Sequence, residues 1–574
     1  MLQLLGFLLL AVASPTGQSS DLLLEGAMVY VSADAAPQRA SVLIRSGKID
    51  FVGNAETARR KSPLASRIDL TGSFLFPGFA DAHGHLSGLG KSLEIADLRG
   101  ATSAAEAARR VGAGAAKLPS GAWAEGRGWD QNLWGGRFPD ARDLDTVVSE
   151  RPVVARRVDG HAIWVNSAAL RAAGIDRSTP DPSGGRILRR ADGSPSGVLV
   201  DTANALIEKA MPAPTPTDFE RQVLAAMEAC TRVGLTEVGD ASAYDPEDIA
   251  LLERLAARRQ LPIRVYATVG TGGGSRRSSY EGGRAPASDA LTLFFQKGVH
   301  IGRGDDFLTV RAIKTYADGA LGSRGAALLA DYSDEPGNRG WLITPSEQLD
   351  ALARRAREHG WQLWVHAIGD LGNRVSLDAF ERARAAIPKA DSGGDRPRIE
   401  HAQVIALSDI PRFAQIGVIA SIQPTHATSD MPWAEQRLGP DRIQGAYAWR
   451  RLVNAGARLA GGSDFPVESH NPLLGFYAAV TRRDLSGKPE GGWRPQEKLT
   501  RPEALALFTS GAAYAAFEED RRGRVAPGFD ADLTILASDP MTVPESQIPS
   551  ITTVLTVTGG RIVYGKGFSS GARP

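Results

Sequence analysis

The stretch Phe76-Pro-Gly-Phe-Ala-Asp81-Ala-His83-Gly-His85 joins an apolar run of strand type to two histidines at its end. Successive side chains of a strand point to opposite faces, so His83 and His85 project to the same side. Residues two apart lie about 7 Å apart along a strand, and at that spacing two imidazoles can converge on one metal ion. Most isolated H-x-H pairs are incidental, so the rest of the chain must decide whether this strand end binds metal.

Eight further runs of strand type follow this stretch. They are Val153–Asp159, Thr236–Asp240, Ile263–Val269, Val310–Asp318, Gln362–Ile368, Arg398–His401, Val418–Gln423 and Arg458–Asp464. From Thr236 onward, segments long enough for a helix separate the runs, which is typical of a parallel α/β core. The total exceeds by one the eight strands that a closed barrel needs. The sequence thus predicts an α/β fold, a TIM (β/α)8 barrel over residues 75–522.

The supernumerary run, Val153–Asp159, lies among sequence rich in Trp, Gly and Arg. We therefore expect residues 98–215 to form an insertion after strand 1, and long insertions often shape a binding site. Both ends of the chain, residues 21–74 and 523–568, contain short strand-like runs separated by glycine turns. This pattern of short strands and glycine turns predicts a small composite β-sandwich built from the N- and C-terminal segments.

Residues 1–18 contain an apolar run that ends in a small-residue A-x-A pattern. The run is too short to cross a membrane and resembles a secretory signal peptide. We expect a secreted or periplasmic protein; the alternative is an ordinary N-terminal strand in a cytoplasmic protein. No later stretch reaches 18 uninterrupted apolar residues, so the sequence predicts no membrane span.

Composition narrows the function classes. The 574 residues include 66 basic and 65 acidic side chains, and a net charge of +1 gives no reason to expect a nucleic-acid partner. A hydrophobic share of 43% argues against disorder. The single cysteine, Cys230, excludes an internal disulfide and a thiolate cluster. Histidine and carboxylate must therefore hold any metal, and the expected partner is a small molecule, with a homo-oligomer compatible with the composition.

Three more strand ends carry residues able to bind metal, namely His366, His401 and Asp464. Counted back from the Asp464 strand as strand eight, His401 lies on strand six and His366 on strand five. Each histidine alone is more simply a core or surface residue. Their placement at successive carboxyl ends, where barrel enzymes build their sites, predicts a metal centre.

Lys314 lies on strand four of the same count. A protonated lysine cannot ligate a cation, and burying it beside metals is costly. Two solutions remain open from the residues alone. Lys314 pairs with a carboxylate such as Asp318, or carbon dioxide converts it to an anionic carbamate that bridges two metals.

These motifs resemble the amidohydrolase superfamily, specifically the amidohydrolase-3 branch of YtcJ-like and N-substituted formamide deformylase-like proteins. The resemblance covers nearly the whole chain after the signal segment. The matching motifs, in order, are PGFADAHGHL, GWDQNLW, RVDGHAIWVNSAAL, KTYADGALGSR, VHAIGD, EHAQ, GSDFPV and VAPGFDADLTIL.

The resemblance implies one metal on His83, His85 and Asp464. A second would sit on His366 and His401, with carbamylated Lys314 bridging the two. One or two divalent ions are expected, with zinc as the default and iron or manganese as alternatives.

The implied reaction is hydrolysis of a non-peptide C–N bond in a small amide, N-formyl or N-acyl compound. Metal-bound hydroxide attacks the carbonyl, and Asp464 transfers the proton to the leaving nitrogen. The same centre would also suit a cyclic amidase, an esterase or a deaminase. A non-enzymatic binding protein on the same scaffold is the third hypothesis.

Other residues are candidates for substrate contacts. His161, in Val-Asp-Gly-His, is placed to donate a hydrogen bond to the substrate carbonyl, and Trp129 and Asp130 to line the pocket. Arg324 is a candidate for reading an anionic group. A purely structural role is the alternative for each of them. His426 and His470 follow late strands, and we assign them no role from the sequence.

Overall fold

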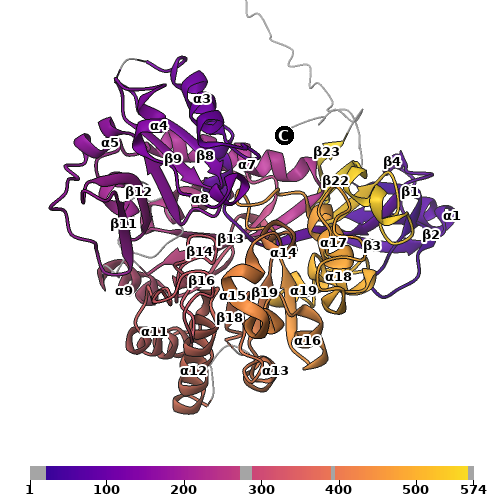
Figure 1. The fold of residues 1–574 in the computed structure, drawn as a ribbon. Helices are drawn as coiled ribbons and strands as arrows, with labels where there is room; N and C mark the ends of the chain where they lie inside the picture. The colour runs from indigo at the N-terminus through magenta and orange to yellow at the C-terminus, as the bar shows by residue number, and fades with distance from the viewer. Residues whose placement is uncertain (1–20, 120, 272–287, 389–394, 566–574) are drawn as a thin grey trace, which may run out of the picture.

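The computed structural model describes residues 21–119, 121–271, 288–388 and 395–565, so the expected signal segment 1–18 lies outside the described residues. Three β-sheets organise this part of the chain (Figure 1). They are a parallel barrel, a sheet inserted after the first barrel strand, and a sheet shared by the two ends of the chain. None of the helices within the described residues is long and apolar enough to cross a membrane.

The central sheet is the predicted TIM barrel. Its eight parallel strands, in spatial order, are β6 (Phe79–Gly84), β13 (Leu235–Tyr244), β14 (Arg264–Gly270), β16 (Leu308–Tyr316), β17 (Gln362–Ala367), β18 (Arg398–His401), β19 (Ile419–Ile422) and β20 (Arg458–Gly461). A short strand, β15 (His300–Gly302), pairs antiparallel with β16. The first and last strands meet where the Asp464 N–H donates to the His83 carbonyl at 2.7 Å. This hydrogen bond brings the first metal-ligand motif, which contains His83, next to the last one, which contains Asp464.

Helices surround the barrel (Figure 1). Those between barrel strands include α7 (Pro216–Arg232), α8 (Pro246–Ala257), α9 (Ser288–Lys297), α10 (Arg303–Asp306), α11 (Ser346–Glu358), α12 (Asp370–Ala386), α13 (Ile410–Ile416), α14 (Pro424–Asp430), α15 (Ala434–Arg442) and α16 (Trp449–Asn454). After β20 come α17 (Pro472–Thr481), α18 (Arg501–Leu507) and α19 (Ser510–Ala515).

Helix α7 shows how sequence sets such a helix. Thr215 and Asp218 form a reciprocal capping box, and proline occupies the first turn. Its buried residues recur at helical spacing and include Phe219, Val223, Ala226, Met227 and Cys230.

The insertion is a separate layer with its own core. It follows β6 and α2 (Leu86–Ser92) and contains β7 (Ala96–Asp97), β8 (Ala124–Trp129), β9 (Val153–Arg157), β10 (Ala162–Val165), β11 (Gly185–Arg189) and β12 (Pro195–Asp201). Its helices are α3 (Ala104–Ala115), α4 (Ala141–Asp145), α5 (Ser167–Ala172) and α6 (Asn204–Glu208). The supernumerary strand run thus belongs to this sheet as β9, as predicted, and the barrel keeps its eight strands.

The two ends of the chain build one β layer together. From the N-terminal side come β1 (Leu22–Val29), β2 (Gln38–Arg45), β3 (Lys48–Gly53), α1 (Ala55–Lys61), β4 (Ser66–Asp69) and β5 (Phe74–Pro77). From the C-terminal side come β21 (Leu533–Leu536), β22 (Thr553–Thr558) and β23 (Arg561–Gly565). Strand β5 pairs with β1 on one side and antiparallel with β21 on the other. The composite β unit that we expected is therefore present, and its strands form one hydrogen-bonded sheet.

The predicted strand Phe76–Ala82 is divided at Gly78. Strand β5 ends at Pro77 in the composite sheet, and β6 begins at Phe79 in the barrel. A Cβ at Gly78 would lie 2.3 Å from the Thr236 Oγ1 and 2.9 Å from the Asp532 carbonyl carbon. Only glycine permits this close approach, and a sequence pattern of apolar residues does not reveal it.

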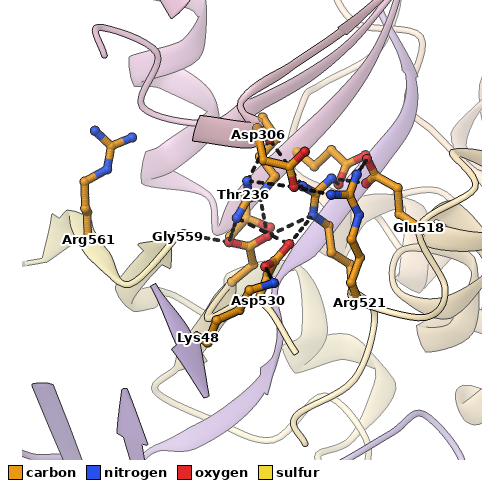
Figure 2. Close-up of polar contacts among 12 residues, drawn as sticks. Lys48, Thr236, Asp306, Glu518, Arg521, Asp530, Gly559 and Arg561 are labelled. Atoms are coloured by element: carbon orange, nitrogen blue, oxygen red, sulfur yellow. Dashed lines mark hydrogen bonds and ion pairs between the residues drawn. The ribbon is translucent and has the colours of Figure 1, made fainter. Parts of the chain in front are cut away.

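A buried network of ion pairs fastens the composite sheet to the amino-terminal ends of the barrel strands. Figure 2 shows this basal ion network, with its members Lys48, Asp306, Glu518, Arg521 and Asp530 labelled. Its other members are Glu237, Arg264, Arg522 and Asp532. Arg264, at the start of β14, binds both oxygens of Asp532 at 2.7 and 3.1 Å. Arg522 reaches Asp530 at 3.0 Å and Asp306 at 2.7 Å. Each buried cation in this network has a carboxylate partner.

Candidate metal centre

The six predicted metal ligands meet at the carboxyl ends of the barrel strands. His83 and His85 lie at the end of β6, and Asp464 follows β20; the others are Lys314 on β16, His366 on β17 and His401 on β18. All six are buried. Five of them line a cavity of about 380 Å³, and His83, which has no exposed surface, lies behind the wall.

His83, His85 and Asp464 form the tightest group. The Nε2 atoms of His83 and His85 lie 3.4 and 3.0 Å from the Asp464 Oδ1. Burial alone would raise the pKa of Asp464, but its contacts with the two histidines outweigh burial and hold the pKa well below its usual range. Asp464 is therefore ionised at neutral pH and faces two imidazole nitrogens.

A buried carboxylate fixes the orientation of His83. Glu400, the residue before His401, contacts the His83 Nδ1, and Arg398 binds Glu400 at 2.8 Å. Burial opposes ionisation, but Arg398 and His83 lower the pKa of Glu400 to about 2. A histidine held by a carboxylate at Nδ1 presents Nε2 to the opposite side, which is the usual support of a metal-binding imidazole.

Asp81 ties the first strand end to the last. Its carboxylate accepts hydrogen bonds from the Ser463 hydroxyl at 2.6 Å and from the His83 N–H at 3.0 Å. The next residue, Asp464, has a φ of 58°, a left-handed conformation that few non-glycine residues adopt. Asp81 thus helps to hold a strained loop that turns Asp464 toward the histidines.

His366 and His401 form a second pair beside this group. Their ring centroids are 4.5 Å apart, and the His401 Nδ1 lies 2.8 Å from the Gln423 Oε1. Burial, followed by neighbouring positive groups, lowers the pKa of both histidines well below the usual value. Both are therefore neutral at physiological pH, the form in which imidazole binds metals.

Lys314 lies between the two groups. Its Nζ is 3.5 Å from the His83 Nε2, and its side chain is almost fully buried. Asp318, which we considered as a partner, instead accepts hydrogen bonds from the backbone N–H groups of Ile368, Gly369 and Ala327 at 2.7 to 2.9 Å. Asp318 therefore fixes the loop after β17.

The donor chemistry of the cavity fits a divalent cation. Within the described residues, the Asp464 Oδ1 and the His426 Nε2 are buried and lack a hydrogen-bond partner. The donor atoms of His83, His85 and Asp464 lie within 4.8 Å of one another, as do those of His401, His426 and Asp464. Buried polar atoms without partners are costly, and a cation shared by these donors would satisfy them.

Comparisons with known proteins agree with this geometry. The model of the amidohydrolase family matches residues 67–564. The amidohydrolase YtcJ of Bacillus subtilis is 36% identical over 551 residues, covering 94% of this chain and 99% of that protein. The chain belongs to the amidohydrolase family.

Further relatives extend this result. The N-substituted formamide deformylase of Arthrobacter pascens is 27% identical over 537 residues, covering 91% of this chain and 94% of that enzyme. A crystal structure described as an uncharacterized metal-dependent hydrolase from Pyrococcus horikoshii OT3 is 28% identical, with a TM-score of 0.71, over 92% of this chain and 99% of that one. As an amidohydrolase, the protein is an enzyme, a hydrolase built on the barrel fold described above.

The insertion of this amidohydrolase brings His161 and Asp130 to the cavity wall. The His161 ring centroid is 5.0 Å from that of His366, and its Nδ1 lies 2.8 Å from the Asp201 Oδ1. Asp130 forms an ion pair with Arg157. Both predicted residues therefore line the same cavity as the candidate ligands, although they come from a different sheet.

Trp129 and Arg324 lie elsewhere and are not among the residues that line the cavity in the described part of the chain. The Trp129 ring is fully buried in the core of the insertion, where Nε1 donates to the Ala155 carbonyl at 2.7 Å. Arg324 pairs with Asp334 at 2.9 Å and with Glu335 at 3.1 Å. The aromatic ring serves packing, and the guanidinium is occupied by local carboxylates.

Three residues near the cavity had no role in the sequence analysis. Asp201 lies 40 positions after His161, and no local pattern links the two. Glu400 stands next to His401 in the motif EHAQ, but its partner His83 is 317 positions away. His426 follows β19 in Gln-Pro-Thr-His, which was its only sequence signal.

Proposed function

We propose that this amidohydrolase is a metal-dependent enzyme that cleaves a non-peptide C–N bond in a small amide, N-formyl or N-acyl compound. The observation that carries the proposal is the convergence of the His83 Nε2, the His85 Nε2 and the ionised Asp464 on one point of a buried cavity. The names of the relatives support it, since one is an N-substituted formamide deformylase and another a metal-dependent hydrolase.

We assign His83, His85 and Asp464 to a first divalent ion, with zinc as the default. We assign His366 and His401 to a second ion, with Lys314 as a carbamate between the two. The position of Lys314 supports the carbamate, because an ammonium group 3.5 Å from a ligand nitrogen would repel a cation. Loss of a proton from Nζ, addition of carbon dioxide to the neutral amine and loss of a second proton would replace that positive charge with the negative charge of a carbamate.

A divalent ion bound here would lower the pKa of a water ligand and polarise a carbonyl oxygen. Asp464 accepts the proton of the attacking water and delivers it to the leaving nitrogen. His161 keeps Nδ1 on Asp201 and contacts the substrate carbonyl through Nε2. Asp130 borders the part of the cavity that receives the rest of the substrate. A volume of about 380 Å³ suits a small molecule.

The same donors would serve a cyclic amidase, an esterase or a deaminase, and the bond cleaved must be tested directly. We would measure metal content after purification with added zinc, then assay N-formyl amines, N-acyl amines, lactams, esters and amidines. The proposal expects bound metal, and turnover of an N-formyl or N-acyl amine that disappears in Asp464→Ala. Turnover of lactams, esters or amidines alone would favour one of the alternatives, and a purified protein without metal would favour the non-enzymatic hypothesis.

We also propose export of the protein, because residues 1–18 have the pattern of a secretory signal. Sequencing the N-terminus of the protein recovered from its native host tests this. A mature chain that starts after the small-residue pattern is expected, and a chain that retains residues 1–18 would contradict export.

A further inference from the structure

Strand seven of the barrel brings another histidine to the cavity. Strand β19 ends at Ile422, and His426 lies in the first turn of α14, four residues later. The six predicted ligands come from strands one, four, five, six and eight. His426 therefore adds a donor from a strand end that contributes nothing to the predicted set.

The position of His426 is defined by two neighbours. Its Nε2 lies 3.5 Å from the Asp464 Oδ2, and its ring stacks on His401 with centroids 5.7 Å apart and planes at 18°. The side chain is 12% exposed, and Nε2 is buried without a hydrogen-bond partner among the described residues. In the tautomer that carries its proton on Nδ1, the Nε2 lone pair in this position is available to a cation.

Asp464 stands between two sets of donors. Its Oδ1 faces His83 and His85, whereas its Oδ2 faces His426. The donor atoms of His401, His426 and Asp464 lie within 4.8 Å of one another. Ligands of tetrahedral zinc lie about 3.3 Å apart, given bonds of about 2.0–2.2 Å, so modest side-chain adjustments would bring all three onto one ion.

We propose that His426 is a further metal ligand, which completes a second donor set with His401 and Asp464. This inference rests on the metal-dependent function proposed above. It assigns to α14 a part in holding the ion on the His401 side of the centre. His366 lies at the edge of that set, because its Nε2 points to the Gly319 carbonyl at 3.4 Å.

Metal binding itself is the test. The wild type, His426→Ala, His426→Gln, His83→Ala and the control His359→Ala are stripped with a chelator and titrated with Co²⁺. His359 is exposed and bonded to the Arg355 carbonyl, away from the cavity. Stoichiometry, affinity against a chromophoric chelator, and the visible Co²⁺ spectrum are recorded. Thermal unfolding confirms that each variant is folded, and the near-isosteric His426→Gln carries the test if the alanine variant unfolds.

We expect both His426 variants to bind one Co²⁺ at least about 10-fold more weakly than the wild type, with a changed spectrum, while His359→Ala matches the wild type. If the His426 variants bind Co²⁺ as tightly as the wild type while His83→Ala binds it more weakly, the inference is overturned and the proposed function stands. Absence of binding in the wild type would instead overturn the proposed function.

Discussion

Two clusters of buried ionisable groups lie at opposite ends of the barrel, and they are composed differently. In the basal ion network, guanidinium groups meet carboxylates at hydrogen-bond distance, as Arg264 does with both oxygens of Asp532. At the carboxyl ends, histidine nitrogens and Asp464 face one another, and the Asp464 Oδ1 lacks a hydrogen-bond partner within the described residues. The first cluster is satisfied by ion pairs within the protein, whereas the second consists of imidazole nitrogens and a carboxylate, the groups that bind a divalent cation.

The difference indicates that the groups at one end of the barrel contribute to stability and those at the other end to function. Carboxyl ends of barrel strands carry the chemistry of such enzymes, and the amino-terminal ends serve stability. Removing a cation from the basal ion network should therefore weaken folding and spare turnover. Removing a donor from the candidate metal centre should abolish turnover, whatever it costs in stability. Four variants test this division.

The largest effect is expected for His83→Ala. This variant removes a nitrogen that faces Asp464, so metal binding and turnover should be lost together, with activity reduced at least about a thousandfold. Metal analysis and a hydrolase assay measure both, and the melting temperatures of the metal-free variant and the metal-free wild type report separately what the lost Glu400 contact costs in stability. A folded variant that binds metal as the wild type does would show that His83 is a structural residue.

Arg264→Ala should act in the opposite way. It removes both guanidinium bonds to the buried Asp532, which keeps the Gly559 N–H at 2.7 Å and Arg522 at 3.6 Å. Breaking a buried ion pair typically costs about 3–5 kcal/mol, and the remaining partners make this an upper bound. Chemical denaturation should show this loss, while turnover per folded molecule at low temperature stays at the wild-type level. The control is Arg259→Ala, whose side chain is 70% exposed and pairs with the exposed Asp305; there a loss of at most about 1 kcal/mol is expected. Equal losses in the two variants would refute a special role for the basal network.

Asp201→Asn should have an intermediate effect on activity. Asp201 acts through His161 as a positioning residue, so we expect turnover to fall by about 10- to 100-fold with metal content unchanged. In a His161→Ala background the same substitution should change turnover little, because its target is gone. Glu150→Gln, on an exposed residue of the insertion, serves as the control. Additive losses in the double variant would show that Asp201 works independently of His161.

The smallest effect concerns Glu237 in the basal network. Burial first, and then the neighbouring Glu518, raise the pKa of Glu237 well above its usual value. The folded state therefore keeps a proton that the unfolded chain releases above about pH 4.3, and stability falls as the pH rises toward the folded-state pKa. Glu237→Gln imitates the protonated form and should escape this fall.

We expect the Glu237→Gln and wild-type proteins to melt together near pH 4. At pH 8 the variant should melt about 1–2 °C higher, as measured by thermal unfolding across this pH range. A variant that melts below the wild type at pH 8 would mean that Glu237 is ionised and stabilises Arg522, which lies 3.5 Å away.

The sequence predicts the barrel because strand-type runs alternate with segments long enough for a helix, and five of the eight strands end near a recognisable residue, such as His366, His401 or Asp464. It fails where contacts span hundreds of residues. Glu400 and His83 are 317 positions apart, and the chain offers no local sign that they touch. The sequence likewise does not show that Gly78 must be glycine, because that requirement comes from the close approach of Thr236, 158 positions later.

The positions of the expected substrate-side residues are harder to predict than those of the candidate metal ligands, for the same reason. Trp129 and Arg324 have suitable chemistry, but their neighbours decide their roles. The Ala155 carbonyl binds the indole of Trp129, and Asp334 neutralises Arg324. His161 and Asp130 reach the cavity because the insertion folds over the barrel mouth, a placement that no strand pattern contains.

The pairing of β5 with β21 has a consequence for the timing of synthesis. Strand β5 ends at Pro77, and its partner β21 begins only at Leu533. At about 5–20 residues per second, the nascent chain exposes the open edge of β5 for on the order of half a minute or more before β21 is made. An unpaired strand edge is a template for aggregation. A chaperone that binds the nascent chain would therefore protect this edge of β5 until β21 has been synthesised.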